Sequence, residues 1–216
     1  MIEKESQDKD LRRRVIEQLR NITQATREKL RRGEKPAFTL VLPDEAKKVI
    51  REWVLKPNPR LSEVAFIGVG VDDKVDRVYA PDTDFSSHSG LGYDGFSGSR
   101  IDTKELGMLF DRVTYDGKLD EMLFIGHLHP SGEAIISGVR HIRVPSEFLL
   151  YPSGNDIEYV KKFVESNPQI HIPYEAITAN TEHGPALRIY SVQGLIGAKR
   201  YREHDIKKIP QQTIAL

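Results

Sequence analysis

The spacing of apolar residues divides the chain into one long helix and a following mixture of strands and helices. Between Leu11 and Arg32, apolar residues recur every three or four positions, which predicts an amphipathic helix that Gly33 would end. A second helix is expected after Pro43, because four apolar residues would share one side of it: Ala46, Val49, Ile50 and Trp53.

Strands are predicted where short apolar runs lie between turn residues. Residues 63–71 and 75–80 are typical of a hairpin that turns across Asp72, Asp73 and Lys74. Residues 121–127 (EMLFIGH) are typical of a buried strand leading into a His-Leu-His-Pro turn. The remaining predicted elements are a β-prone run over 37–42, helices over 102–112 and 155–166, and a second hairpin made of 174–180 and 186–193.

The segments between these elements suggest how the chain is organised. Residues 81–100 are rich in Gly and Ser and predict a long, mobile loop, and long loops in compact domains are often functional. The residues from about Lys199 predict a charged tail. We therefore expect an N-terminal basic helix over 1–35, one domain over 36–196 and a C-terminal tail over 197–216.

Composition narrows the classes of function. The 216 residues include 32 Lys plus Arg and 32 Asp plus Glu, so no global charge attracts nucleic acid or a membrane surface. No apolar run approaches the roughly 18 residues of a membrane span. With no cysteine, the chain has no thiolate ligand or nucleophile, and any metal must be held by His and carboxylates. We expect a cytoplasmic protein without membrane contacts.

The N-terminal helix is locally basic in spite of the neutral total. Basic residues outnumber acidic ones between Leu11 and Lys35. The favoured interpretation is a solvated face whose apolar stripe packs on the domain or on a second copy, as in a homodimer. Contact with a polyanion is the less favoured interpretation.

The candidate chemistry begins with two histidines. His127 and His129 stand two residues apart at the end of a predicted strand, so their side chains point the same way and can share a cation. Such a pair alone is more often unrelated to metal. Downstream, Ser153 precedes Asp156 by three residues at the start of a predicted helix, which alone is also typical of a capping box.

Taken together, His-Leu-His-Pro-Ser-Gly (127–132) and Pro-Ser-Gly-Asn-Asp (152–156) resemble the signature of the JAB/MPN (JAMM) family of zinc metalloproteases. The His-Pro-Ser-Gly wording is also close to the RadC-type branch. Upstream, a helix followed by Ser-Glu-Val-Ala-Phe-Ile-Gly resembles the family's opening helix and the strand with the catalytic glutamate. The resemblance implies an α/β (α+β) fold with a mixed β-sheet flanked by helices, in a cytidine-deaminase-like layout with an extra N-terminal helix.

The resemblance also implies roles for individual residues. Zinc would be held by His127, His129 and Asp156, with the fourth position left for water. Glu63 would be the acid/base that takes a proton from this water and returns it to the leaving amine, and Ser153 would stabilise the oxyanion. The expected substrate is an amide bond at the C-terminal tail of a ubiquitin-like protein or its conjugate.

An insertion leaves the third ligand open to alternatives. Residues 133–151 separate the two halves of the motif, which lie only a few residues apart in the family. If this insertion folds inward, Glu133, His141 or Glu147 could replace Asp156; otherwise it is expected to form a flap or a partner surface. The other histidines, His88, His171 and His183, are most simply surface residues.

Two other classes of function remain open. A non-catalytic MPN-type scaffold would keep the fold and bind partners, but the presence of all five motif residues argues against it. A RadC-type nucleic-acid-associated protein is favoured by the motif wording and the basic helix, and disfavoured by the zero net charge.

Overall fold

The computed structural model describes residues 39–57, 63–82, 103–130, 149–197 and 206–216, and the two short strands at 133–136 and 140–143. The predicted N-terminal helix, the β-prone run before residue 39 and most of the predicted loop 81–100 lie outside the described residues. So do the side chains of Glu133, His141 and Glu147, the alternative ligands.

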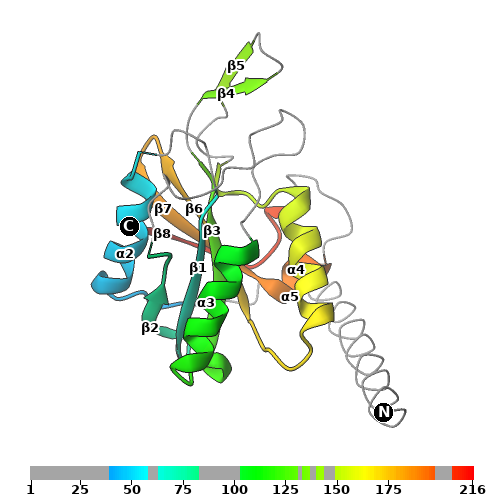
Figure 1. Ribbon diagram of the computed structural model, residues 1–216. Helices are drawn as coiled ribbons and strands as arrows, with labels where there is room; N and C mark the ends of the chain where they lie inside the picture. Colours follow the sequence, from blue (N-terminus) through cyan, green and yellow to red (C-terminus); the bar gives the residue numbers. More distant parts are fainter. Residues whose placement is uncertain are drawn as a thin grey trace.

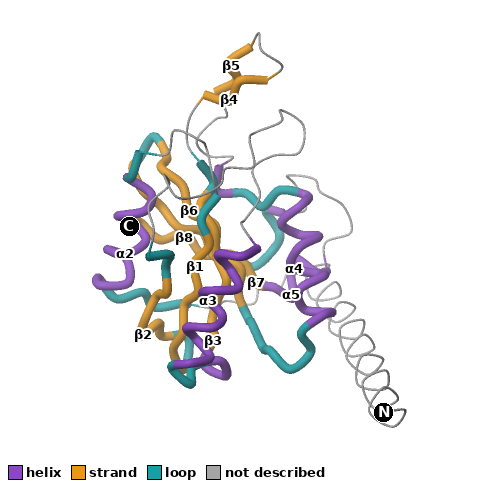
Figure 2. Tube along the Cα trace, viewed as in Figure 1, coloured by secondary structure: helices purple, strands orange, loops and turns teal. Residues whose placement is uncertain are grey.

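The described chain forms a curled, mixed six-stranded sheet with helices on both faces (Figures 1 and 2). The strand order is β2-β1-β3-β6-β7-β8. Only β3 and β6 run parallel; the other neighbours are antiparallel. Their bounds are β1 Ala65–Val71, β2 Lys74–Tyr79, β3 Met122–Leu128, β6 Tyr174–Thr181, β7 Gly184–Ser191 and β8 Gln211–Ala215. The prediction of a mixed sheet flanked by helices is thus confirmed.

Successive side chains of each strand point to opposite faces of the sheet, so the sheet has a hydrophobic core on each face. Helix α2 (Asp44–Leu55) covers one face, where it packs on Phe66, Phe124 and neighbouring residues. Helices α3 (Thr103–Tyr115), α4 (Gly154–Ser166) and α5 (Val192–Gly197) cover the other face (Figure 1). Ala46, Ile50 and Trp53 of α2 are buried, as the sequence pattern predicts, because the helix turns one apolar stripe to the sheet.

The predicted β1–β2 hairpin is confirmed, and its turn is tight. Asp72 and Asp73 have positive φ values of 52° and 59°. This geometry is typical of the two-residue turn whose twist matches that of the strands it joins. The hydroxyl of Tyr174 on β6 donates to Asp73 Oδ1 over 2.7 Å. The hairpin end is therefore fixed to the centre of the sheet.

The insertion contains a separate two-stranded sheet of β4 (Glu133–Ile136) and β5 (Arg140–Arg143). A 3-10 turn, η1 (Leu119–Glu121), precedes β3. Among the described residues, no helix is long and apolar enough to cross a membrane.

The predicted charged tail over 197–216 is wrong for residues 206–216. Ile206 and Ile209 are buried beneath α5, and β8 adds an edge strand in which Ile214 faces Leu187. The apolar residues that decide this packing, Ile206, Ile209 and Ile214, are spaced three and five residues apart, so the pattern had no clear period. The second predicted hairpin is confirmed, but its second strand begins and ends two residues earlier than expected, since α5 begins at Val192.

Residues 40 and 41 connect the two outer strands of the sheet. Val41 forms a parallel bridge with Lys74 of β2. The side-chain amide of Gln212 on β8 accepts the Leu40 N–H at 2.8 Å and donates to the Leu40 carbonyl at 3.2 Å. One segment thus pairs through its backbone with the edge strand β2 and contacts the other edge strand, β8, through the Gln212 side chain.

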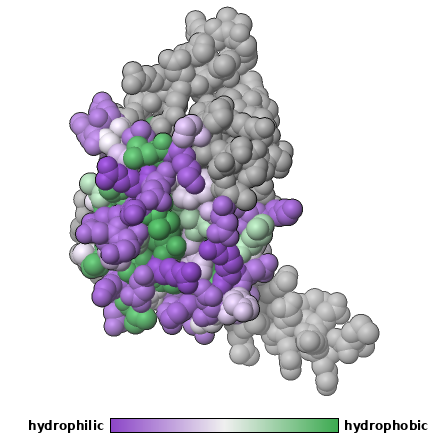
Figure 3. Space-filling model, turned by 60° about the vertical axis from the view of Figure 1, so that its left-hand side comes forward, coloured by the Kyte–Doolittle hydropathy of each residue, from purple (hydrophilic) through white to green (hydrophobic). Residues whose placement is uncertain are grey.

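The face shown in Figure 3 is mainly hydrophilic, with apolar residues gathered near its middle. Over the described residues, the large apolar side chains that are exposed are Val41, Leu55, Val71, Met108 and Tyr115. Met108 and Tyr115 both belong to α3, and the other three lie on separate segments; scattered exposed apolar residues of this kind are ordinary for a protein surface.

Candidate metal centre

The centre is built at the carboxyl end of β3. His127 is the sixth residue of this strand, and His129 follows its last residue. The two side chains point to the face covered by α3 and α4, because residues two apart in a strand share a face. Gly126 lets β6 approach closely at this point, since a Cβ there would lie 2.8 Å from the Ala176 carbonyl oxygen.

The first turn of α4 brings Asp156 to the histidines. The chain leaves β3, returns through α4 and enters the parallel strand β6. In such a crossover, the helix that precedes the second strand begins on the side of the sheet where the carboxyl end of the first strand lies. Ser153 is the N-cap of α4: its hydroxyl accepts the Asp156 N–H at 3.2 Å, and the Asp156 carboxylate accepts the Ser153 N–H. This capping box fixes the direction of the carboxylate.

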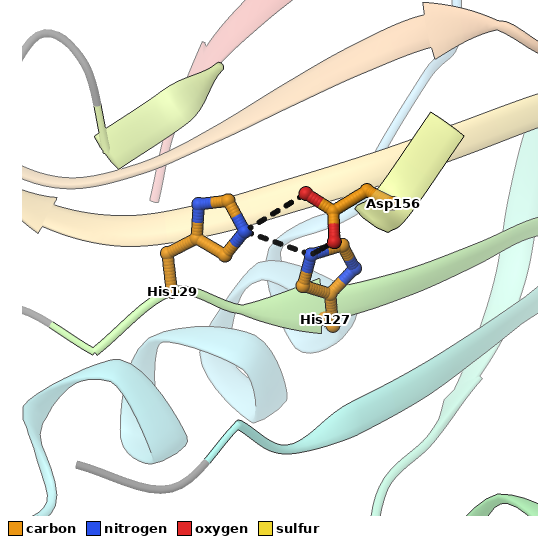
Figure 4. A group of neighbouring side chains, drawn as sticks. All are labelled: His127, His129 and Asp156. Carbon is orange, nitrogen blue, oxygen red and sulfur yellow. Dashed lines mark hydrogen bonds and ion pairs between the residues drawn. The ribbon is translucent and has the colours of Figure 1, made fainter. Parts of the chain in front are cut away.

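The three side chains converge (Figure 4). His127 Nε2 lies 2.9 Å from His129 Nε2, and Asp156 reaches both rings, with Oδ1 3.5 Å from His127 Nε2 and Oδ2 3.4 Å from His129 Nε2. His127 is 1% exposed. Two imidazole nitrogens and one carboxylate are thus gathered in a mostly buried place, as a group able to hold a metal ion.

The other ring nitrogens are held by fixed partners. His127 Nδ1 lies 3.1 Å from Glu175 Oε1 of β6, and His129 Nδ1 lies 2.7 Å from the carbonyl oxygen of Leu149. Both partners are acceptors, so each Nδ1 carries its hydrogen and each Nε2 is directed toward the shared centre. This is the usual arrangement of metal-binding histidines, in which an outer partner sets the tautomer and the ring orientation.

The donor atoms are close enough together to share one metal ion. For metal–ligand distances of roughly 2.0–2.1 Å, as in zinc sites, neighbouring donors lie about 3.3 Å apart. The two imidazole nitrogens lie 2.9 Å apart, one Asp156 oxygen lies 3.5 Å from His127 Nε2, and the other lies 3.4 Å from His129 Nε2. Taking one ligand atom from each residue, the three atoms lie within 4.8 Å of one another. A set of two imidazoles and one carboxylate also leaves a fourth position open, which is the composition of catalytic zinc sites.

Charge also favours a cation. Burial opposes the charged form of His127, but the Asp156 carboxylate outweighs it, helped by Glu175 and Glu63, so the pKa of His127 is well above its usual value. Burial likewise opposes ionisation of Asp156, yet His127 and His129 hold its pKa far below the usual range. Burial raises the pKa of Glu175, and the His127 contact offsets part of this. Without a metal, a proton on His127 partly balances the buried carboxylates; a divalent cation would do so more fully.

Glu63 lies beside this group. It precedes β1, is buried, and is close enough to His127 for its charge to raise the histidine's pKa. Ala65 faces His127 in the antiparallel β1–β3 ladder, so extending that register by two residues sets Glu63 opposite His129. Glu105 of α3 accepts the Ala65 N–H at 3.1 Å and so anchors the start of β1.

The structure thus brings His127, His129 and Asp156 together, with Glu63 and Ser153 at their margins. His171 and His183 lie on the surface, as expected, and His88 lies outside the described residues. Sequence reasoning missed Glu175. The signal for it was a glutamate between Tyr174 and Ala176, inside an apolar run where a charge is costly.

Two comparisons with known proteins, by family model and by curated sequence, identified no relative of this chain. No protein-family model matches the chain, and no curated protein matches it significantly. The similarity to the JAMM signature therefore rests on the residues quoted above and on the geometry they adopt.

Proposed function

We propose that this protein is a zinc-dependent metallohydrolase of the JAMM type that cleaves an amide bond at the C-terminal tail of a ubiquitin-like protein or its conjugate. The observation that carries the hydrolase part is the meeting of His127 Nε2, His129 Nε2 and the Asp156 carboxylate, with both outer ring nitrogens held by acceptors. A set of two imidazoles and one carboxylate, with the buried carboxylate of Glu63 beside it, suits activation of water.

The proposed roles follow from the chemistry of each group. His127, His129 and Asp156 would hold the zinc, which supplies Lewis acidity and a water whose pKa is lowered to about 7. Glu63 takes a proton from the attacking water and returns it to the leaving amine. Ser153 uses its oxygen as an acceptor in the capping box, which leaves its O–H as a donor for the developing oxyanion.

The substrate class rests on the resemblance of the motif. An amide is compatible with the centre, because a metal-activated water with an adjacent general base is one established means of amide hydrolysis. The ubiquitin-like tail is chosen from the resemblance, and the geometry of the centre favours it no more than other peptides. The cleavage experiment must therefore include ubiquitin-like fusions and unrelated peptides.

The test combines metal analysis with cleavage assays. Purified protein should carry about one zinc per chain and cleave a ubiquitin-like fusion, lose cleavage with a chelator and regain it when zinc is returned. The variant His129→Ala should lose the metal, whereas the surface variant His183→Ala should keep metal and activity. Zinc binding without cleavage of any peptide or fusion would favour a scaffold, and salt-dependent DNA binding would favour a nucleic-acid-associated protein.

A further inference from the structure

A carboxylate lies in the interior of the sheet, on the central strand β6. Glu175 is 2% exposed, and its chain neighbours Tyr174 and Ala176 are buried as well. Glutamate is almost never buried this fully without a partner, because its charge loses the solvation of water. The fold alone gives no reason for an acid here, since an apolar residue would pack at lower cost.

The partner of this carboxylate is a histidine of the metal centre. In the parallel β3–β6 ladder, Glu175 faces Ile125 and Ile177 faces His127, so Glu175 and His127 share one face and lie two ladder positions apart. Glu175 Oε1 is 3.1 Å from His127 Nδ1, on the side of the ring opposite to Asp156. The contact joins two side chains that are both excluded from water.

The two histidines differ in what holds them. The outer nitrogen of His129 donates to a neutral backbone carbonyl, that of Leu149, whereas that of His127 donates to a carboxyl group. A carboxylate partner makes the imidazole a stronger electron donor than a carbonyl does, and it orients the ring. Of the two rings, the more deeply buried one, that of His127, is thus the one held by a carboxyl group.

We infer that Glu175 is a positioning residue of this centre: it fixes the His127 ring with Nε2 toward the metal and strengthens metal binding through that ring. The inference rests on the proposed function for the presence of the metal, and it does not depend on which bond is cleaved. It extends the functional set beyond the motif to a residue on a different strand.

The test measures zinc affinity by competition with a chromophoric chelator, beside the thermal midpoint of the metal-free protein. Glu175→Gln keeps the size and an acceptor oxygen but removes the charge, and should weaken zinc binding about 10-fold; Glu175→Ala also removes the acceptor, and should weaken it about 100-fold. The matched control is Glu105→Gln, a second buried glutamate, which accepts a backbone N–H and should leave zinc affinity unchanged.

The outcomes separate this inference from the proposed function. Wild-type zinc affinity in both Glu175 variants would overturn the positioning role, even if the midpoint of the metal-free protein fell, because that fall would show a purely structural role. If the Glu175 variants bind zinc more weakly but the zinc-loaded wild type cleaves no substrate, the positioning role of Glu175 is supported and the hydrolase proposal is rejected. A wild-type protein that binds no zinc would reject both.

Discussion

The carboxylate of Asp156 and the hydroxyl of Ser153 each accept the other's backbone N–H at the start of α4, while the same carboxylate reaches both histidines. The two interpretations of Ser-x-x-Asp, a capping box and half of a metal motif, are therefore compatible. The oxygen that accepts the Ser153 N–H, Oδ2, is also the one that lies 3.4 Å from His129 Nε2, and a carboxylate oxygen has two lone pairs, so one oxygen can serve both contacts. The cap also fixes the direction of the carboxylate.

The first prediction concerns the third ligand. Asp156→Asn keeps an oxygen that can accept the Ser153 N–H but loses the charge, and should weaken zinc binding by about 10-fold or more, equivalent to roughly 1.4 kcal/mol. Asp156→Ala should abolish stoichiometric zinc. Metal analysis after gel filtration checks both. Asp44→Asn, in the exposed first turn of α2, is the control. Full zinc content in Asp156→Ala would show that Asp156 is not the third ligand.

The second prediction separates the two roles of Ser153. Replacing an N-cap serine by alanine costs about 1 kcal/mol, whereas glycine costs only a few tenths. Ser153→Gly should therefore unfold in urea nearly as the wild type does. It should nevertheless lose roughly 10²- to 10³-fold in kcat, because the oxyanion donor is gone. If the zinc-loaded glycine variant hydrolyses substrate at the wild-type rate, Ser153 serves the helix alone.

The sequence predicted the elements of the centre better than its surroundings. The continuous apolar run of β3 and the helical periodicity of α4 located these two elements. The choice of His127, His129 and Asp156 as one ligand set came instead from the resemblance to the JAMM signature, with alternatives to Asp156 left open. Glu175 could not be assigned in this way, because its partner lies 48 residues away and only the parallel pairing of β3 and β6 brings them together. The edge strand β8 was missed for a related reason: its pairing with β7 and the contact from Leu40 come from distant parts of the chain.

The third prediction concerns the turn that precedes β2. Replacing Asp73 by glycine would remove the strain of a non-glycine residue at positive φ, but it would also remove the hydrogen bond that the Tyr174 hydroxyl donates to Asp73. Asp73→Gly should therefore destabilise the protein by about 1 kcal/mol. In a Tyr174→Phe background, where the bond is already lost, the same substitution should be neutral or stabilising. Urea unfolding of the four proteins of this cycle gives the coupling. Simple additivity would show that the bond contributes nothing to stability.

The last prediction concerns the proton carrier. Glu63 is buried beside His127 but is not one of the three converging ligands, so Glu63→Gln should retain zinc while losing hydrolysis. Glutamine keeps the shape of the side chain and cannot accept a proton, and loss of general acid–base catalysis reduces kcat by roughly 10²- to 10⁴-fold. The measurement pairs zinc content with kcat on one preparation. Because loss of zinc would also abolish activity, only a zinc-loaded, inactive variant supports the role. Hydrolysis at the wild-type rate would remove Glu63 from the mechanism and direct the search for the base to another group near the metal.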